Sequence, residues 1–297
     1  MTSTTTTVDA GRLAVPGGEL YHEVRGSGPL VLVIGQPMTA EPFTPLAELL
    51  AADHTVVTYD PHGLGRSTVE DPSLPVTPEV QADDLALLVA HLGGGPADVV
   101  ASSGGAVTGL ALAARHPQLV RTLVAHEPPV CDLLPDAAHV RAVTDGIVEA
   151  FEQHGSGAAW GGFVALVVHD GELTGPSVPP AAWSPPGPAD GAAGDTAPPQ
   201  PPEPSAKQQA DDALFFLRML KPFTRYAPDE AALRSGGPRV LVGVGATSGA
   251  GVAVRSARAL ADRLGVTPTV FPGDHGGFMA DPQGFAAVLR PLLADPS

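Results

Sequence analysis

Continuous apolar and β-branched runs recur along the chain, as expected of strands that are covered on both faces. The clearest are residues 30–34 (LVLVI) and 55–59 (TVVTY). The segments 11–15 and 19–26 are joined by Pro-Gly-Gly and predict an opening hairpin. Further strands are expected at residues 97–101, 120–126, 239–244 and 268–271. The pattern therefore predicts eight strands.

Helical patterns separate most of these strands. Residues 41–53 carry apolar side chains at helical spacing. Thr77 and Pro78 supply an N-cap and a first-position proline for a helix that Gly93 ends. Because strands alternate with helices, we predict an α/β fold in which a mostly parallel eight-stranded sheet is covered by helices on both faces.

The alternation stops in the middle of the chain. Two apolar helical patterns, at residues 136–155 and 211–223, flank a stretch that holds eleven of the 33 prolines between positions 175 and 205. We predict a helical cap inserted between the sixth and seventh strands, with a flexible Pro-rich loop at about 172–206. The expected domains are an α/β core, 1–127 and 238–297, and a cap, 128–237.

Composition narrows the class of protein. The chain has 16 basic and 32 acidic residues and a net charge of −16, which would repel a nucleic acid. No apolar run is long enough to cross a membrane, and the N-terminus does not resemble a secretory signal. A single cysteine, Cys131, excludes an internal disulfide and a cysteine-based zinc site. These features predict a cytoplasmic protein that binds no membrane and needs no cofactor or metal.

Two adjacent serines follow the strand at residues 97–101, in the stretch VVASSGGAV. A strand, a tight turn and a helix form the context in which a G-x-S-x-G serine is exposed above a sheet edge. With Ser103 as the nucleophile, both outer positions of the motif are small, Ala101 and Gly105. With Ser102 instead, Val100 would occupy the first of them. We therefore favour Ser103; the alternative is that the stretch is only a turn.

The order and spacing of these segments resemble the α/β-hydrolase fold family over most of the chain outside the predicted cap. The segment 60–67 (DPHGLGRS) resembles that family's D-x-x-G-x-G-x-S loop, so His62 is interpreted as a structural loop residue. The family places its catalytic histidine after the last strand, where His275 lies in GDHGGF. The resemblance implies that His275 accepts the Ser103 proton and returns it to the leaving group.

The expected acid departs from the commonest family pattern. Residues 246–249 (ATSG), where an aspartate often lies, contain no carboxylate. Glu127, at the end of the preceding strand, is the candidate that would orient His275. Its alternative interpretation is an ordinary surface glutamate. Asp274 is adjacent to His275 in sequence and is not expected to reach the correct ring nitrogen.

The expected oxyanion hole also departs from the family. The stretch 34–37 (IGQP) has glutamine where the family often has histidine after its third strand. The backbone N–H groups of Gln36 and Gly104 can still form the hole, and the Gln36 side-chain amide is a candidate third donor.

Together these residues predict a serine hydrolase that acts on an ester-like carbonyl of a small molecule through an acyl-enzyme. A perhydrolase, lyase or cyclase on the same fold is left open, as is a non-catalytic small-molecule-binding protein with a degenerate triad. A homodimer is left open as well.

Overall fold

One sheet runs through the protein, and the computed structural model describes residues 7–176 and 204–294. Its strands are β1 (Val8–Val15), β2 (Gly18–Arg25), β3 (Leu30–Ile34), β4 (Thr55–Tyr59), β5 (Thr68–Val69), β6 (Ala97–Ser102), β7 (Val120–His126), β8 (Arg239–Gly245) and β9 (Thr269–Phe271). They lie in the order β1-β2-β4-β3-β6-β7-β8-β9, with β5 paired to β2. Neighbours from β4 to β9 pair in parallel, and β2 pairs antiparallel to β1, β4 and β5.

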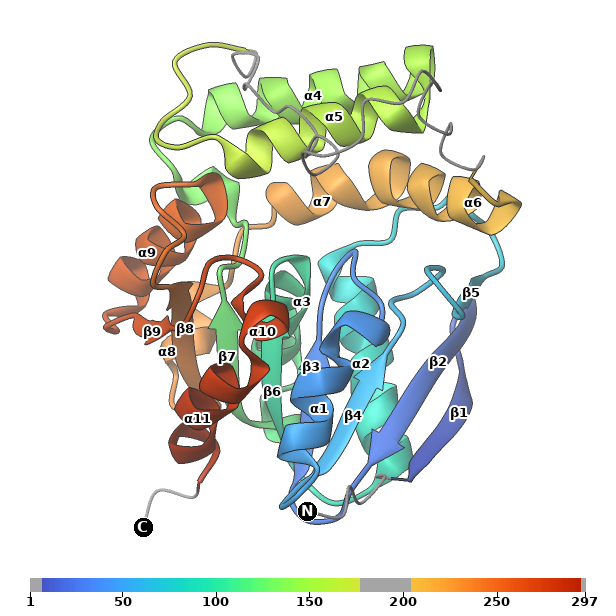
Figure 1. Ribbon diagram of the computed structural model, residues 1–297, viewed down its shortest axis with the longest axis vertical. Helices are drawn as coiled ribbons and strands as arrows, with labels where there is room; N and C mark the ends of the chain where they lie inside the picture. The colour runs from blue at the N-terminus through green and yellow to red at the C-terminus, as the bar shows by residue number, and fades with distance from the viewer. Residues whose placement is uncertain (1–6, 177–203, 295–297) are drawn as a thin grey trace, which may run out of the picture.

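Helices cover both faces of the sheet (Figure 1). They are α1 (Thr44–Leu50), α2 (Pro78–Leu92), α3 (Gly104–Arg115), α4 (Ala137–His154), α5 (Ser156–Val168), α6 (Ala206–Leu214), α7 (Leu220–Thr224), α8 (Glu230–Arg234), α9 (Val252–Leu264), α10 (Gly277–Ala280) and α11 (Pro282–Leu293). Leu85 of α2, Leu110 of α3 and Leu260 of α9 belong to the core on one face. Leu46 of α1 and Leu289 of α11 belong to the core on the other face.

This arrangement confirms the predicted α/β architecture, with one correction to the strand count. The sheet has nine strands because the two-residue β5 pairs with the start of β2. A segment of two residues is too short to show alternation in the sequence. Without β5, β7 and β8 are the predicted sixth and seventh strands, and the expected helical insertion lies between them.

The helices of this insertion lie above the carboxyl ends of the parallel strands (Figure 1). The predicted patterns correspond to α4 and to the stretch from α6 to α7, which includes a π-helical turn at Phe215–Met219. The sequence patterns missed α5, whose three glycines lower its helix propensity. Residues 177–203, most of the predicted Pro-rich loop, lie outside the described residues.

A buried ion pair joins the start of the insertion to the core. Asp136, next to α4, accepts hydrogen bonds of 2.8 and 2.9 Å from Arg255 on α9. The same carboxylate accepts the backbone N–H of Leu173 at 2.7 Å. Since both carboxylate oxygens have partners, the position of the insertion over α9 is held by hydrogen bonds as well as by apolar packing.

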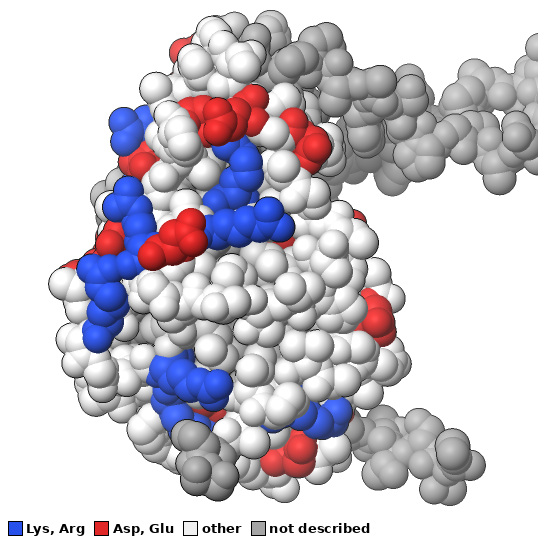
Figure 2. Space-filling model, turned by 90° about the vertical axis from the view of Figure 1, so that its left-hand side faces the viewer, with Lys and Arg blue, Asp and Glu red and all other residues white. Residues whose placement is uncertain are grey.

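Charges are interleaved on one face of the molecule (Figure 2). The exposed pairs of the described residues include Arg141–Asp132, Arg225–Asp145 and Arg263–Glu230. Exposed ion pairs of this kind contribute little to stability.

Among the residues that the structure describes, no helix is long and apolar enough to span a bilayer.

Candidate functional site

The candidate site residues follow the carboxyl ends of parallel strands. Gln36 comes after β3, Ser103 after β6 and Glu127 after β7, while His275 comes after β9. The chain order reverses between β3 and β6. Ligands of open α/β sheets bind outside the carboxyl ends of strands at such a reversal. The fold thus brings together residues that are far apart in the sequence.

Ser103 lies in a strained turn between β6 and α3. Its φ is 57° and its ψ is −129°, a conformation that L-residues rarely adopt. The Ser103 N–H donates to the His126 carbonyl at 3.0 Å and fixes the turn against the neighbouring strand. A strained serine at a strand-to-helix turn is the geometry that exposes a nucleophile.

Two glycines allow this turn to approach β3 closely. A Cβ on Gly104 would lie 2.8 Å from side-chain carbons of Gln36. A Cβ on Gly105 would lie 2.6 Å from the Gly35 Cα and 2.7 Å from the Ile34 carbonyl oxygen. Since backbone atoms cannot move aside cheaply, the SSGG sequence meets a steric requirement of the site.

The two serines have different surroundings. Ser103 is half-buried and lines the cavity that His275 also lines. Ser102 is buried, and its Oγ lies 3.1 Å from the Nδ1 of His126. Ser102 is therefore in contact with His126 and does not line this cavity, and the choice of Ser103 as nucleophile stays a prediction.

Glu127 and His275 are in contact, as the sequence predicts. The His275 Nδ1 lies 2.7 Å from the Glu127 Oε2. The other carboxylate oxygen, Oε1, accepts the Gly245 N–H at 2.8 Å. Glu127 also has a positive φ, 46°, immediately after β7. Asp274 instead accepts the Gly276 N–H at 2.9 Å.

Glu127 is held as a carboxylate. Its side chain is 1% exposed, against 30% for that of His275. Burial alone would raise the pKa of Glu127, but its polar neighbours, above all the hydrogen bond with His275, lower it to about 2. In a neutral histidine whose Nδ1–H is donated to a carboxylate, the other ring nitrogen, Nε2, carries no proton.

His126 is a site residue that sequence reasoning missed. Its ring is 6.3 Å from that of His275, between centroids, and packs edge-on against Phe271 and Phe285. Burial lowers the pKa of His126 to about 4, so the imidazole is neutral at pH 7. Because Ser102 and His126 are cross-strand partners, their contact joins the two strand ends that precede Ser103 and Glu127. The only sequence signal was the position of His126 directly before Glu127.

The expected oxyanion-hole residues lie beside Ser103 at the same cavity. As the first residue of α3, Gly104 has no acceptor for its N–H within the helix. The Gln36 side chain, however, donates to the Met219 Sδ at 2.8 Å and accepts from Gln81 at 3.1 Å. The Gln36 amide nitrogen carries a second hydrogen besides the one donated to Met219, so the expected third donor stays a prediction.

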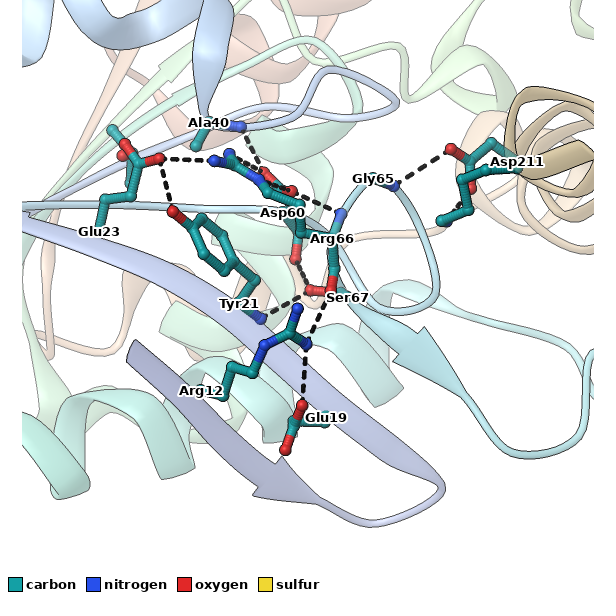
Figure 3. Close-up of polar contacts among 12 residues, drawn as sticks. Arg12, Glu19, Tyr21, Glu23, Ala40, Asp60, Gly65, Arg66, Ser67 and Asp211 are labelled. Atoms are coloured by element: carbon teal, nitrogen blue, oxygen red, sulfur yellow. Dashed lines mark hydrogen bonds and ion pairs between the residues drawn. The ribbon is translucent and has the colours of Figure 1, made fainter. Parts of the chain in front are cut away.

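The loop that resembles the family's D-x-x-G-x-G-x-S segment has structural contacts (Figure 3). Asp60 accepts the N–H groups of Ala40 at 2.9 Å and Arg66 at 2.7 Å, and Ser67 bonds to the Asp60 carbonyl at 2.6 Å. The Gly65 N–H donates to Asp211 of α6 at 3.3 Å. The Tyr21 N–H of β2 donates to the Ser67 Oγ at 2.9 Å, so the loop that follows β4 contacts both β2 and α6.

His62 lies in a different cavity from Ser103. Its Nδ1 is 2.8 Å from the buried Asp84, and the two line a cavity of about 420 Å³ beside α2. This placement agrees with a structural role for His62. Among the described residues, no group of three or more His, Cys, Asp or Glu side chains is arranged to hold a metal ion.

Comparison with known proteins adds a family to this geometry. A family model described as "alpha/beta hydrolase fold" matches residues 28–204. The chain is 41% identical over 129 residues to a Bacillus subtilis protein named "Uncharacterized hydrolase YraK", over 43% of this chain and 48% of that protein. It thus spans about half the length of this relative.

Solved structures share the fold at low sequence identity. An esterase from Exiguobacterium antarcticum has a TM-score of 0.68 at 17% identity, over 94% of this chain and 97% of the esterase. A thermophilic esterase from Thermogutta terrifontis has a TM-score of 0.66 at 20% identity, over 96% of this chain and 98% of that esterase.

Proposed function

Because the chain belongs to the α/β-hydrolase fold family, we propose that it is a serine hydrolase that cleaves an ester-like carbonyl through an acyl-enzyme. The observation that carries the proposal is the contact of 2.7 Å between the His275 Nδ1 and the buried Glu127 carboxylate, beside the cavity that holds Ser103. The esterase names of structural relatives support the same class of reaction.

In the first half of the reaction, the Ser103 Oγ attacks the carbonyl carbon while the His275 Nε2 takes the hydroxyl proton. Glu127 holds the Nδ1–H and stabilises the imidazolium. The carbonyl oxygen becomes an oxyanion, which accepts hydrogen bonds from the backbone N–H groups of Gln36 and Gly104. Removing one such donor in other enzymes costs about 2.7–4 kcal/mol in the transition state.

The tetrahedral intermediate then collapses. The bond between the carbonyl carbon and the leaving oxygen breaks, and His275 gives its proton to that oxygen. In the second half, His275 takes a proton from water, and the resulting hydroxide attacks the acyl carbon. The bond between that carbon and the Ser103 Oγ then breaks, and His275 returns the proton to the Oγ. The products are an acid and an alcohol.

Two serine variants test the proposal. Ser103→Ala should abolish hydrolysis of p-nitrophenyl acetate because it removes the nucleophile. Ser102→Ala should only weaken hydrolysis, because Ser102 contacts His126 and does not line the cavity. Equal losses in both variants would contradict the assignment. Lack of turnover in the unmodified protein would favour a non-catalytic binding site.

A further inference from the structure

Two cavities meet at His275. The inner cavity measures about 50 Å³ and is also lined by Ser103, Gln36 and Gly104. The outer cleft measures about 560 Å³ and is also lined by Ser248 and Glu127. Since the nucleophile and both oxyanion donors belong to the inner cavity, the acyl group of a substrate belongs there. The leaving oxygen must lie next to the acid that protonates it, so the alcohol points into the outer cleft.

The inner cavity is small. A cavity needs at least about 10–15 Å³ to hold one water molecule. A volume of about 50 Å³ therefore accommodates about three to five non-hydrogen atoms, which corresponds to an acyl group of about two to four carbons.

The walls of the inner cavity are apolar and closely packed. Phe163 and Phe215 line it, together with Leu166, Leu220 and Phe223. The Phe215 ring lies 5.3 Å from that of Phe163, 5.5 Å from Trp160 and 4.9 Å from Phe216, between centroids. Such a packed aromatic cluster resists expansion, so a longer acyl chain would have to displace side chains that support one another.

Polar side chains at the inner cavity, other than Ser103 and His275, already have partners. Gln36 is bonded to Met219 and Gln81, as described above. The Thr224 Oγ1 donates to the Leu220 carbonyl at 2.8 Å, and the Cys131 Sγ to the Pro129 carbonyl at 3.2 Å. A polar or charged acyl group would lose its hydrogen bonds to water without replacing them, so an apolar acyl group is favoured.

The outer cleft is acidic. Asp170 and Asp274 lie on its exposed rim, and no Lys or Arg is among the described residues that line either cavity. An anionic leaving group would therefore meet like charges. Two exposed charges at short range should lower kcat/KM by about tenfold for an anion, and by less at high salt.

From these two cavities we infer that the substrate is an ester of an apolar acyl group of about two to four carbons with a neutral or cationic alcohol. This inference rests on the proposed function.

The acyl half is tested with neutral p-nitrophenyl esters below their critical micelle concentrations. We expect kcat/KM for the butanoate to exceed that for the octanoate by at least tenfold. Phe163→Ala enlarges the inner cavity and should reduce this ratio to below about threefold. Phe151→Ala is the matched control, since Phe151 packs on Phe216 at 5.4 Å and does not line the cavity. It should leave the ratio unchanged.

The alcohol half is tested with three butanoate esters of similar size: butanoylcholine, its neutral isostere 3,3-dimethylbutyl butanoate, and the anionic 3-butanoyloxypropanoate. We expect the anion to be the poorest substrate by about tenfold at low salt. The double variant Asp170→Asn/Asp274→Asn should remove most of this difference, while Asp262→Asn, an exposed control on α9, should not.

The results separate this inference from the proposed function. Covalent labelling of the serine together with equal or faster hydrolysis of the octanoate would overturn the acyl assignment alone. Equal or faster hydrolysis of the anionic ester would overturn the alcohol assignment alone. Absence of both labelling and turnover on every ester would overturn the proposed function, and the substrate class with it.

Discussion

Acidification from pH 7 to pH 5 should lower the free energy of unfolding of this protein, in part because His126 resists protonation in the folded state. The substitution His126→Asn should remove the part of this decrease that His126 causes. The His126 side chain is buried between Phe271 and Phe285, and its Nε2 has no hydrogen-bond partner among the described residues. A second proton on this ring would be a buried charge in apolar surroundings. Asparagine does not titrate in this range and can keep a contact with Ser102.

The magnitude follows from the pKa of His126, which burial lowers from about 6.5 to about 4. Because the folded-state pKa is depressed, the unfolded chain binds more protons between these values. This contribution to stability is complete above about pH 6.5 and is lost as the pH falls towards 4. At about 1.36 kcal/mol per pH unit, the full effect is on the order of 3 kcal/mol, of which about 2 kcal/mol arises between pH 7 and pH 5.

Urea unfolding at pH 7 and pH 5 measures this effect. The free energy of unfolding of the unmodified protein should fall by about 2 kcal/mol more than that of His126→Asn. Ser102→Ala is the control, since it removes the partner of the Nδ1 but keeps the titrating ring. It should keep the pH dependence of the unmodified protein. Equal losses in the unmodified protein and His126→Asn would show that protonation of His126 does not cause the loss.

Three further predictions, two of them with a matched second substitution, concern the site and the residues that support it. Glu127→Gln should lower kcat by about 10⁴, the effect of the comparable change in a serine protease, with KM nearly unchanged in steady-state assays; Thr247→Ala should be mild, and the reverse ranking would exclude Glu127 as the acid. Gly105→Ala should destabilise by about 1–3 kcal/mol in urea unfolding, since its Cβ meets backbone atoms. Gly146→Ala places a Cβ in open space within α4 and should instead raise the free energy of unfolding by about 0.5–1 kcal/mol. If both glycine variants changed the free energy of unfolding in the same direction, the clash predicted at Gly105 would be contradicted. Asp60→Asn should lower the free energy of unfolding by about 1–3 kcal/mol because it weakens the buried acceptor of Arg66 and Ala40; unchanged stability would argue against a structural role for this loop.

Much of the fold could be predicted because its central strands are almost fully buried and therefore mostly apolar. The predicted strand at residues 120–126, for example, has the same first and last residues as β7. The same local signal was absent for β5, which is held only by its pairing with β2, and for α5, whose glycines are compensated by packing within the insertion.

The positions of candidate site residues could be predicted where a residue directly follows a predicted strand. Glu127 was found in this way, and the structure shows its contact with His275. The catalytic roles of Ser103, His275 and Glu127 stay predictions. The bonds of the Gln36 side chain to Met219 and Gln81 could not be predicted, since they join segments whose distance in space the sequence does not reveal.

Mass spectrometry after reaction with a fluorophosphonate shows whether Ser103 is a nucleophile activated by His275 and Glu127. We expect one covalent adduct on the intact protein, located by fragmentation on Ser103, and much slower labelling of Glu127→Gln. An adduct on Ser102, or no adduct in a folded protein, would contradict this assignment.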